Sequence, residues 1–337
     1  DKAKRLLNDG VDPGQQKKLD AITAAGSRAN TFAAVAAELL AKKKAEGRAE
    51  QTLSKTAWLY ELARPHIGER PIAEITAPEV LVALRSVETR GQRETARRLR
   101  SVVGEVFRYA IATGRASTDP TFALRGALTA PVVKHHAAIT DPKGIGGLLR
   151  AIDAFNGQPT TVAAMQLLAL IYPRPGELRM AEWSEFDLAK AIWTIPATRT
   201  KMRRPHAVPL PAQAIAILKA LARITGAGKL VLPGYGVAGG DGRKIEPRPI
   251  SENTINAALR RMGFSSDEMS AHGFRAMAST TLNESGKWAP DAIEAALGHQ
   301  DASAVRRAYS RGLYWDERVR MATWWADHLD ELRAARS

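Results

Sequence analysis

The chain has no cysteine, which excludes disulfide bonds, thiolate metal ligands and a cysteine nucleophile. It has only seven histidines, and apart from the adjacent His135 and His136 they lie far apart, so we expect no histidine metal centre. No apolar run is long enough to span a bilayer, and no charged-then-apolar leader opens the chain. These absences are compatible with a reducing cytoplasm and favour a protein that uses no metal and no membrane.

Basic residues are abundant: 49 Lys and Arg stand against 35 Asp and Glu, which gives a formal net charge of +14. A polycation of this kind is attracted to phosphate backbones, because binding releases the counterions condensed there. At 337 residues, of which 45% are hydrophobic, the chain exceeds the usual size of one domain. We therefore expect two domains and a nucleic-acid partner.

The first half carries helical signals. Thr31 to Lys44 has apolar residues at helical spacing, and Thr76-Ala-Pro-Glu79 is a capping-box pattern that predicts a helix start. A further helix, 93–112, would bury Ala96, Leu99, Val102, Val103, Val106 and Phe107. Its opposite face carries a basic stripe of Arg93, Arg97, Arg100 and Arg108. The stripe is either a solvated face or a set of phosphate contacts, and the net charge favours contacts with DNA.

Glycine and proline punctuate residues 113–141, which favours an extended linker between two compact parts. Helical patterns dominate after it, at 147–154, 160–171, 211–225 and 251–262. Two short β-prone runs, 191–196 and 206–210, interrupt them and predict a hairpin. Its turn carries Lys201, Arg203 and Arg204. Lys201 could donate a proton to a leaving oxygen or simply contact DNA, and Arg203 and Arg204 are candidates for phosphate contacts.

Six residues of the second half together supply the parts of a metal-free attack on a phosphodiester. Cations can surround one phosphate, imidazoles can orient or carry protons, and a phenol can attack phosphorus. The candidates are Arg174 in R-P-G-E-L, Lys201 in T-K-M-R-R-P, His272 and Arg275 in H-G-F-R, His299 in L-G-H, and Tyr309 in A-Y-S-R.

Each of these signals is weak by itself. Glu177, three residues after Arg174, either fixes that guanidinium or forms an ordinary surface ion pair. His272 and Arg275 at i, i+3 share one side of a helix, as a surface pair also would. Tyr309 needs nearby cations or a base, because a free phenol has a pKa near 10, and Tyr314 is the competing phenol.

These motifs, in this order and spacing, resemble the tyrosine recombinases, or phage integrases. The tail R-R-A-Y-S-R-G-L-Y-W-D-E-R-V-R-M-A-T-W-W-A-D-H-L is similar to the subgroup found in prophages and genomic islands, and the resemblance covers about residues 30–330. The opening D-G-V-D-P-G resembles the end of the arm-binding domain of those integrases. One departure is Tyr172-Pro173, where many relatives have threonine-glycine, and it bears on the approach angle of Arg174.

The resemblance implies a mainly α fold: a helical core-binding domain and a mostly helical catalytic domain with a small antiparallel β-hairpin. We expect an arm-binding remnant at 1–29, the core-DNA-binding domain at 30–116, a linker at 117–141 and the catalytic domain at 142–333. The family pattern makes Tyr309 the nucleophile of a 3′-phosphotyrosyl intermediate. Arg174, Arg275 and His299 would stabilise the phosphorane, Lys201 would be the general acid and His272 would assist proton transfer.

The family also implies double-stranded attachment sites as the DNA partner, a tetramer on two synapsed duplexes, and accessory DNA-bending proteins. The expected activity is integration and excision of a mobile genetic element, without metal or cofactor, in a bacterial cytoplasm and in association with the nucleoid. Two alternatives stay open: a type IB-like topoisomerase, which would use nearly the same residues, and a catalytically inactive DNA-binding regulator. The apolar face of the last helix (Ala322, Trp325, Leu329 and Leu332) could dock on a neighbouring protomer or on its own domain.

Overall fold

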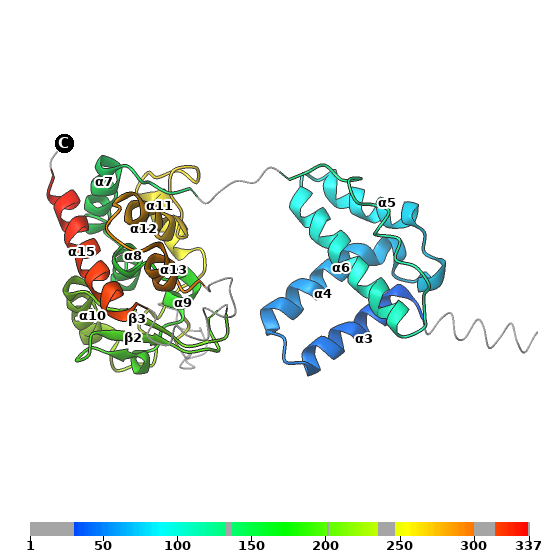
Figure 1. The fold of residues 1–337 in the computed structure, drawn as a ribbon, viewed down its shortest axis with the longest axis horizontal. Coiled ribbons are helices and arrows are strands. Elements are labelled where there is room, and N and C mark those ends of the chain that lie inside the picture. Colours follow the sequence, from blue (N-terminus) through cyan, green and yellow to red (C-terminus); the bar gives the residue numbers. More distant parts are fainter. Residues whose placement is uncertain (1–29, 132–136, 201, 235–246, 300–313, 336–337) are drawn as a thin grey trace, which may run out of the picture. The chain divides into compact units, whose positions relative to one another are not determined.

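A computed structural model describes residues 30–131, 137–200, 202–234, 247–299 and 314–335. The chain divides into two compact parts, Asp1–Val133 and Lys134–Ser337, which we call the N-terminal unit and the C-terminal unit (Figure 1). Helices dominate the described residues and one small antiparallel sheet accompanies them, which confirms the predicted fold class. No helix of the described ranges is both long enough and apolar enough to cross a membrane.

Over residues 30–131 the N-terminal unit has four α-helices and a short 3-10 helix, η1. Thr31 accepts a hydrogen bond from the Ala34 N–H at 3.3 Å and so caps the helix that follows it. The predicted capping box is present, since the Glu79 carboxylate accepts from the Thr76 N–H at 2.8 Å. The elements are α3 (Phe32–Ala45), α4 (Glu50–Ile67), η1 (Ile72–Glu74), α5 (Ala77–Glu88) and α6 (Arg93–Ala112).

Helix α6 has the predicted bounds and the predicted basic stripe. Its apolar face lies in the core, where Phe107 packs against Phe32 with ring centroids 6.2 Å apart. Val102, which the pattern placed among the buried residues, is only half-buried. Within the stripe, Arg100 donates to the Leu124 carbonyl at 3.1 Å and Arg108 pairs with an aspartate. Arg93 and Arg97 are exposed.

Part of the stretch that we predicted as linker packs on the N-terminal unit. Leu124 is buried in its core, and Thr121 is buried beside it. Asp119 accepts from the Arg108 guanidinium at 3.0 Å and so ties the stretch to α6. The composition of this stretch gave no sign of that packing, because its few apolar residues, such as Leu124 and Leu128, make no periodic pattern.

The C-terminal unit surrounds helix α8, which is apolar on all sides and almost wholly buried. An all-round apolar helix is stable only in the interior of a unit, and α8 packs against α7, α10, α11, α12 and α15. The helices are α7 (Pro142–Asp153), α8 (Pro159–Ile171), α9 (Pro175–Arg179), η2 (Trp183–Glu185), α10 (Ala212–Thr225), α11 (Thr254–Arg261), α12 (Gly273–Glu284), α13 (Pro290–Ala296) and α15 (Trp315–Ala334).

The predicted hairpin is present and pairs with one further strand. Strands β2 (Ile192–Ile195) and β3 (His206–Pro209) are antiparallel, with Ile195 opposite His206. The additional strand β1 (Phe186–Asp187) pairs with β2 at the edge of the sheet. The ring of Trp193 is buried and stacks on Phe186 at 5.1 Å between centroids.

The apolar face of α15 packs on its own unit, which settles the choice left open by the sequence. Ala322, Trp325 and Leu329 are buried and Leu332 is half-buried. The Trp325 indole donates to the Ala169 carbonyl of α8 at 2.9 Å. Helix α15 therefore closes the core beside α7 and α8.

Candidate functional site

Arg174 lies in the sharp turn between α8 and α9. Tyr172 caps α8 in the left-handed conformation, with φ 35°, and Pro173 follows, so the chain reverses before the arginine. Glu177 then binds Arg174 twice, accepting from its N–H at 3.1 Å and from its Nη1 at 2.8 Å. Because Glu177 is buried, its carboxylate holds the guanidinium in one orientation.

Arg275 comes from the first turn of α12. Its Nη1 donates to the Tyr172 carbonyl at 3.4 Å, and its Nη2 donates to the Leu297 carbonyl. Burial lowers the pKa of Arg275 to about 10, and the positive charge of Arg174 adds to the effect. The guanidinium remains charged at neutral pH, although a second cation lies beside it.

His299 follows the short helix α13, which ends near the predicted glycine. Gly298 has φ +61°, and this turn directs the chain back toward the arginines. The His299 Nε2 lies 2.9 Å from Arg275 Nη2, and its Nδ1 lies 2.7 Å from the Glu294 carboxylate. A guanidinium can only donate, so Nε2 accepts and the Nδ1–H donates to Glu294.

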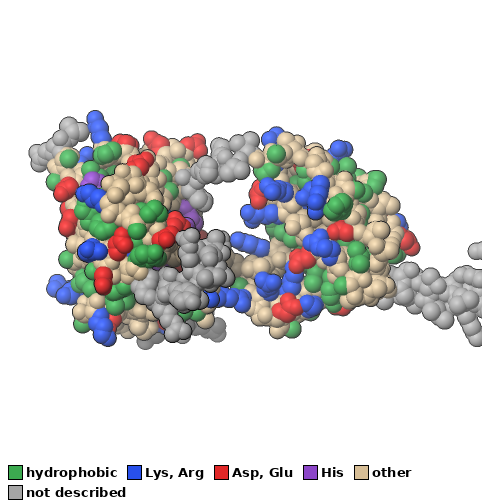
Figure 2. All heavy atoms as spheres, viewed as in Figure 1, with side chains coloured by type: hydrophobic (Ala, Val, Ile, Leu, Met, Phe, Trp, Pro, Cys, Tyr) green, Lys and Arg blue, Asp and Glu red, His purple; other side chains and the backbone are tan. Residues whose placement is uncertain are grey.

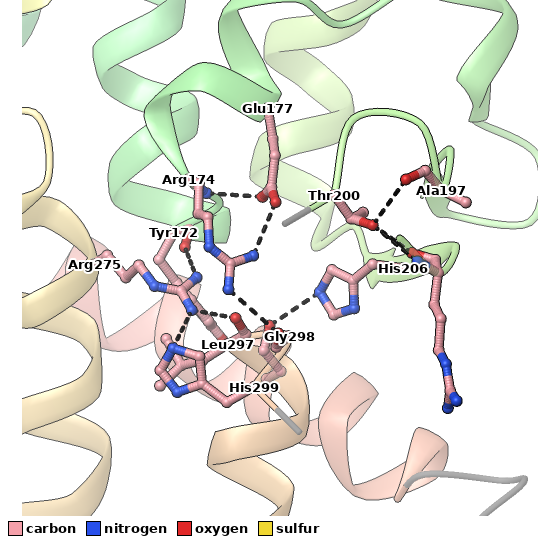
Figure 3. Close-up of polar contacts among 12 residues, drawn as sticks. Tyr172, Arg174, Glu177, Ala197, Thr200, His206, Arg275, Leu297, Gly298 and His299 are labelled. Atoms are coloured by element: carbon pink, nitrogen blue, oxygen red, sulfur yellow. Dashed lines mark hydrogen bonds and ion pairs between the residues drawn. The ribbon is translucent and has the colours of Figure 1, made fainter. Parts of the chain in front are cut away.

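The two guanidiniums converge on the backbone of Leu297 and Gly298, and the His299 imidazole lies against Arg275 (Figure 3). Arg174 Nη2 donates to the Gly298 carbonyl at 3.3 Å, one residue from the carbonyl that accepts from Arg275. Each arginine thus uses some of its five N–H donors on the protein and keeps others for a ligand. Such an arrangement suits an anion with several oxygens, and a phosphodiester is one.

His206 belongs to this group as well, although the sequence analysis did not select it. At the first position of β3, its Nε2 lies 3.2 Å from the Ala296 carbonyl (Figure 3). Burial lowers the pKa of His206 to about 4, and the charges of Arg318, Arg174 and Arg275 lower it further. Its signal in the sequence was its place in T-K-M-R-R-P-H-A-V-P-L, but we read that motif for its cations alone.

The remaining predicted residues are placed as follows. His272 is exposed at the N-cap of α12, one turn before Arg275. Arg203 and Arg204 are exposed in the turn between β2 and β3. The structure therefore brings Arg174, Arg275 and His299 together, whereas Lys201 and Tyr309 lie outside the described residues.

Comparison with known proteins gives matches over nearly the whole chain. A family model described as phage integrase central domain matches residues 32–127, and one described as phage integrase family matches residues 140–314. The IntB protein of Escherichia coli (strain K12) is 39% identical, over 98% of this chain and 84% of its own length. The integrase of Enterobacteria phage P4 is 36% identical, over 98% of this chain and 76% of its own.

The fold is similar to that of lambda integrase. In a crystal structure of its tetramer bound to a Holliday junction, the match covers 81% of this chain and 79% of that one, with a TM-score of 0.61 at 18% identity. A type IB-like topoisomerase and an inactive regulator are not favoured by these matches. The chain belongs to the phage integrase family, the tyrosine-type site-specific DNA recombinases.

Proposed function

We propose that the C-terminal unit cuts and rejoins DNA through a covalent bond to Tyr309. The observation that carries the proposal is that Arg174 and Arg275 bind neighbouring carbonyls, those of Gly298 and Leu297, while the imidazole of the next residue, His299, binds Arg275. Donors placed in advance around a phosphate stabilise the extra negative charge that develops when a nucleophile adds to phosphorus. Arg174 and Arg275 would bind the non-bridging oxygens of the scissile phosphate. His299, whose Nε2 accepts from Arg275 in the free protein, would join them once the phosphate displaces that hydrogen bond and the ring donates through Nε2.

The reaction balances without an added cofactor. The Tyr309 phenol oxygen forms a bond to phosphorus while the bond to the 5′-oxygen of the DNA breaks, and Lys201 gives that oxygen its proton. His272 takes up the phenol proton. The 5′-hydroxyl of another strand then attacks the 3′-phosphotyrosyl bond and restores the phosphodiester; its proton returns to Lys201, and His272 returns a proton to the released tyrosine.

We further propose that the N-terminal unit binds the core DNA site. Lys and Arg side chains gather over the face of this unit shown in Figure 2. In the basic stripe on α6, Arg93 and Arg97 are exposed. Such side chains contact phosphates and set the register on the duplex. In this scheme residues 30–116 bind core DNA, 117–141 connect the domains, and 142–333 carry catalysis, with Arg203 and Arg204 as added phosphate contacts.

The assembly that performs recombination would be a tetramer on two synapsed attachment sites. Support comes from the lambda integrase tetramer on a Holliday junction and from relatives named as prophage integrases. The DNA exchanged would be that of a prophage or genomic island, and DNA-bending accessory proteins would bias integration against excision.

Covalent capture tests the chemistry. The protein is mixed in EDTA with DNA fragments that flank its own gene, quenched with SDS, and examined for a protein-DNA adduct. We expect an adduct in wild type and in Tyr314→Phe, the matched phenol control, but none in Tyr309→Phe. An adduct that survives Tyr309→Phe would overturn the assignment of the nucleophile. Salt-sensitive binding without any adduct would overturn the proposed chemistry.

A further inference from the structure

The end of α13 presents three consecutive carbonyls that side chains from three other elements satisfy. The Ala296 carbonyl lies 3.2 Å from His206 Nε2, the Leu297 carbonyl accepts from Arg275, and the Gly298 carbonyl accepts from Arg174 at 3.3 Å. The last carbonyls of a helix have no partner within the helix. These three donors, from β3, α12 and the turn before α9, therefore fix where α13 ends and where His299 begins.

His206 differs from the two arginines in what it offers a ligand. A carbonyl oxygen only accepts, so Nε2 carries the hydrogen and points at Ala296. The charged groups that face the ring are Arg318 from α15, Arg174 and Arg275, and all three are cations. The ring is neutral at physiological pH, so it supplies a donor without adding another positive charge to the site.

The ring of His206 also lies against Gly298. A Cβ on Gly298 would come within 3.4 Å of the His206 Cε1 and Nε2 atoms. The imidazole therefore contacts the backbone of residues 296–298 both by a hydrogen bond and by packing. A shift of this ring would move the same segment that positions His299.

We propose that His206 is a positioning residue for the strand-cleavage reaction: its Nε2–H holds residues 296–298, and through them His299, in the geometry that receives the scissile phosphate. The inference rests on the proposed function, and it adds a residue that acts through the backbone of residues 296–298. Loss of the donor would slow cleavage by about 100-fold, the size expected when a catalytic group is displaced by about 1 Å. Binding of core DNA would be unchanged, because the phosphate-contacting arginines remain.

The test compares His206→Leu with His206→Gln. The glutamine places an amide N–H at nearly the same distance from the backbone as the ring Nε2, whereas the leucine fills the space without a donor. We expect His206→Leu to lose about 100-fold in the single-turnover rate of adduct formation while its Kd for core DNA stays at the wild-type value. His206→Gln should regain most of the rate. Equal loss of rate in both variants, or an unchanged rate in His206→Leu, would overturn the proposal.

A second measurement is independent of activity. In protein labelled with ¹⁵N-histidine, the His299 ring signals should move in His206→Leu and stay near their wild-type positions in His206→Gln. If wild type forms no adduct but the His299 signals respond in this way, the proposed chemistry fails and the positioning contact stands. If adducts form and the His299 signals do not respond to His206→Leu, the positioning role is wrong and the chemistry stands.

Discussion

Two Gly→Ala variants, at Gly298 beside the site and at Gly286 away from it, separate the effect of backbone strain on stability from the effect of a disturbed site on the cleavage rate. Gly298 follows α13 with φ +61°, and Gly286 follows α12 in the same position with φ +64°. A left-handed residue with a Cβ costs about 1–2 kcal/mol, so both Gly→Ala variants should lose about that much stability. In a unit of this size the loss corresponds to a fall in Tm of about 2–8 °C.

The surroundings of the added methyl group differ between the two positions. At Gly286 nothing lies within 4 Å of the new Cβ, whereas at Gly298 the His206 ring atoms lie at 3.4 Å. At that separation the methyl group touches the ring at the close limit of ordinary van der Waals contact, so a small shift of the strained turn is passed on to the ring. Because the ring also donates to Ala296, the shift reaches the backbone that precedes His299. We expect Gly298→Ala to slow cleavage about 10-fold or more, a fraction of the full cost of misplacing a catalytic group.

Thermal unfolding and single-turnover adduct formation are measured on wild type and both variants. The two variants should lose similar stability, and only Gly298→Ala should lose cleavage rate when assayed well below its Tm. If Gly286→Ala loses a similar fraction of the cleavage rate, the rate loss in both variants comes from the lower stability of the C-terminal unit and not from the contact between residue 298 and His206. A wild-type rate in Gly298→Ala would show that the packing of His206 on the turn is irrelevant to catalysis.

Three further predictions concern other contacts. Glu177→Gln replaces the charge-assisted hydrogen bond to Arg174, which contributes about 2 kcal/mol, so adduct formation should slow about 30-fold. The affinity for DNA should change little, and a large loss of affinity would contradict this reasoning. Arg97→Gln on the basic stripe should reduce the salt dependence of DNA binding: the slope of log Kobs against log salt concentration should become shallower by about 0.9. Arg98→Gln is the control and should leave the slope unchanged, because Arg98 pairs with Glu94 on the same helix. Equal slopes in the two variants would argue against phosphate contacts by the stripe. Hydrogen bonds from Thr76, the N-cap of α5, lower the pKa of Glu79 below its ordinary value of 4.5. The stability that these bonds give the folded protein is therefore present above pH 4.5 and is lost as the pH falls through the lowered pKa. In acid melts of the chain, Glu79→Gln should weaken this loss, and an unchanged pH dependence would mean that the capping box contributes nothing measurable.

Periodic signals made most of the fold predictable from the sequence. The 20-residue pattern of α6 gave its bounds, and the capping-box motif gave the start of α5. Helix α7 begins at Pro142, five residues before the predicted start, because Asp141 caps it by accepting from the Gly144 N–H at 2.7 Å. Its early turns are rich in glycine, which conceals a helical pattern.

Short elements were missed for a different reason. Helix α9 has five residues and β1 has two, so neither contains a full repeat of its own period. Each depends on neighbours: α9 on the turn that follows α8, and β1 on pairing with β2 and on the stack of Phe186 against Trp193. Such elements are specified by tertiary contacts, which a local pattern does not contain.

The candidate site was predictable in its charged residues and not in the groups that hold them. Motif order identified Arg174, Arg275 and His299, and the i, i+3 spacing identified Glu177. The bond from Arg174 to the Gly298 carbonyl joins residues 124 positions apart, and the bond from His206 to Ala296 joins residues 90 apart. A backbone carbonyl has no identity in a sequence, so no motif could have shown that it is the acceptor.

The same backbone acceptors explain how the free protein tolerates two neighbouring cations. Burial is the main cause of the lowered pKa of Arg275, and the charge of Arg174 lowers it further, which means that the two charges repel across a partly buried site. Glu177 and the carbonyls of residues 297 and 298 offset part of this repulsion, and they also prevent the arginines from turning outward to water. What repulsion remains is relieved when a phosphate enters, and relieved further when attack on phosphorus adds negative charge. An interaction that strengthens toward the transition state lowers the barrier, so the unfavourable proximity of the two arginines in the free protein is a source of catalysis in the proposed reaction.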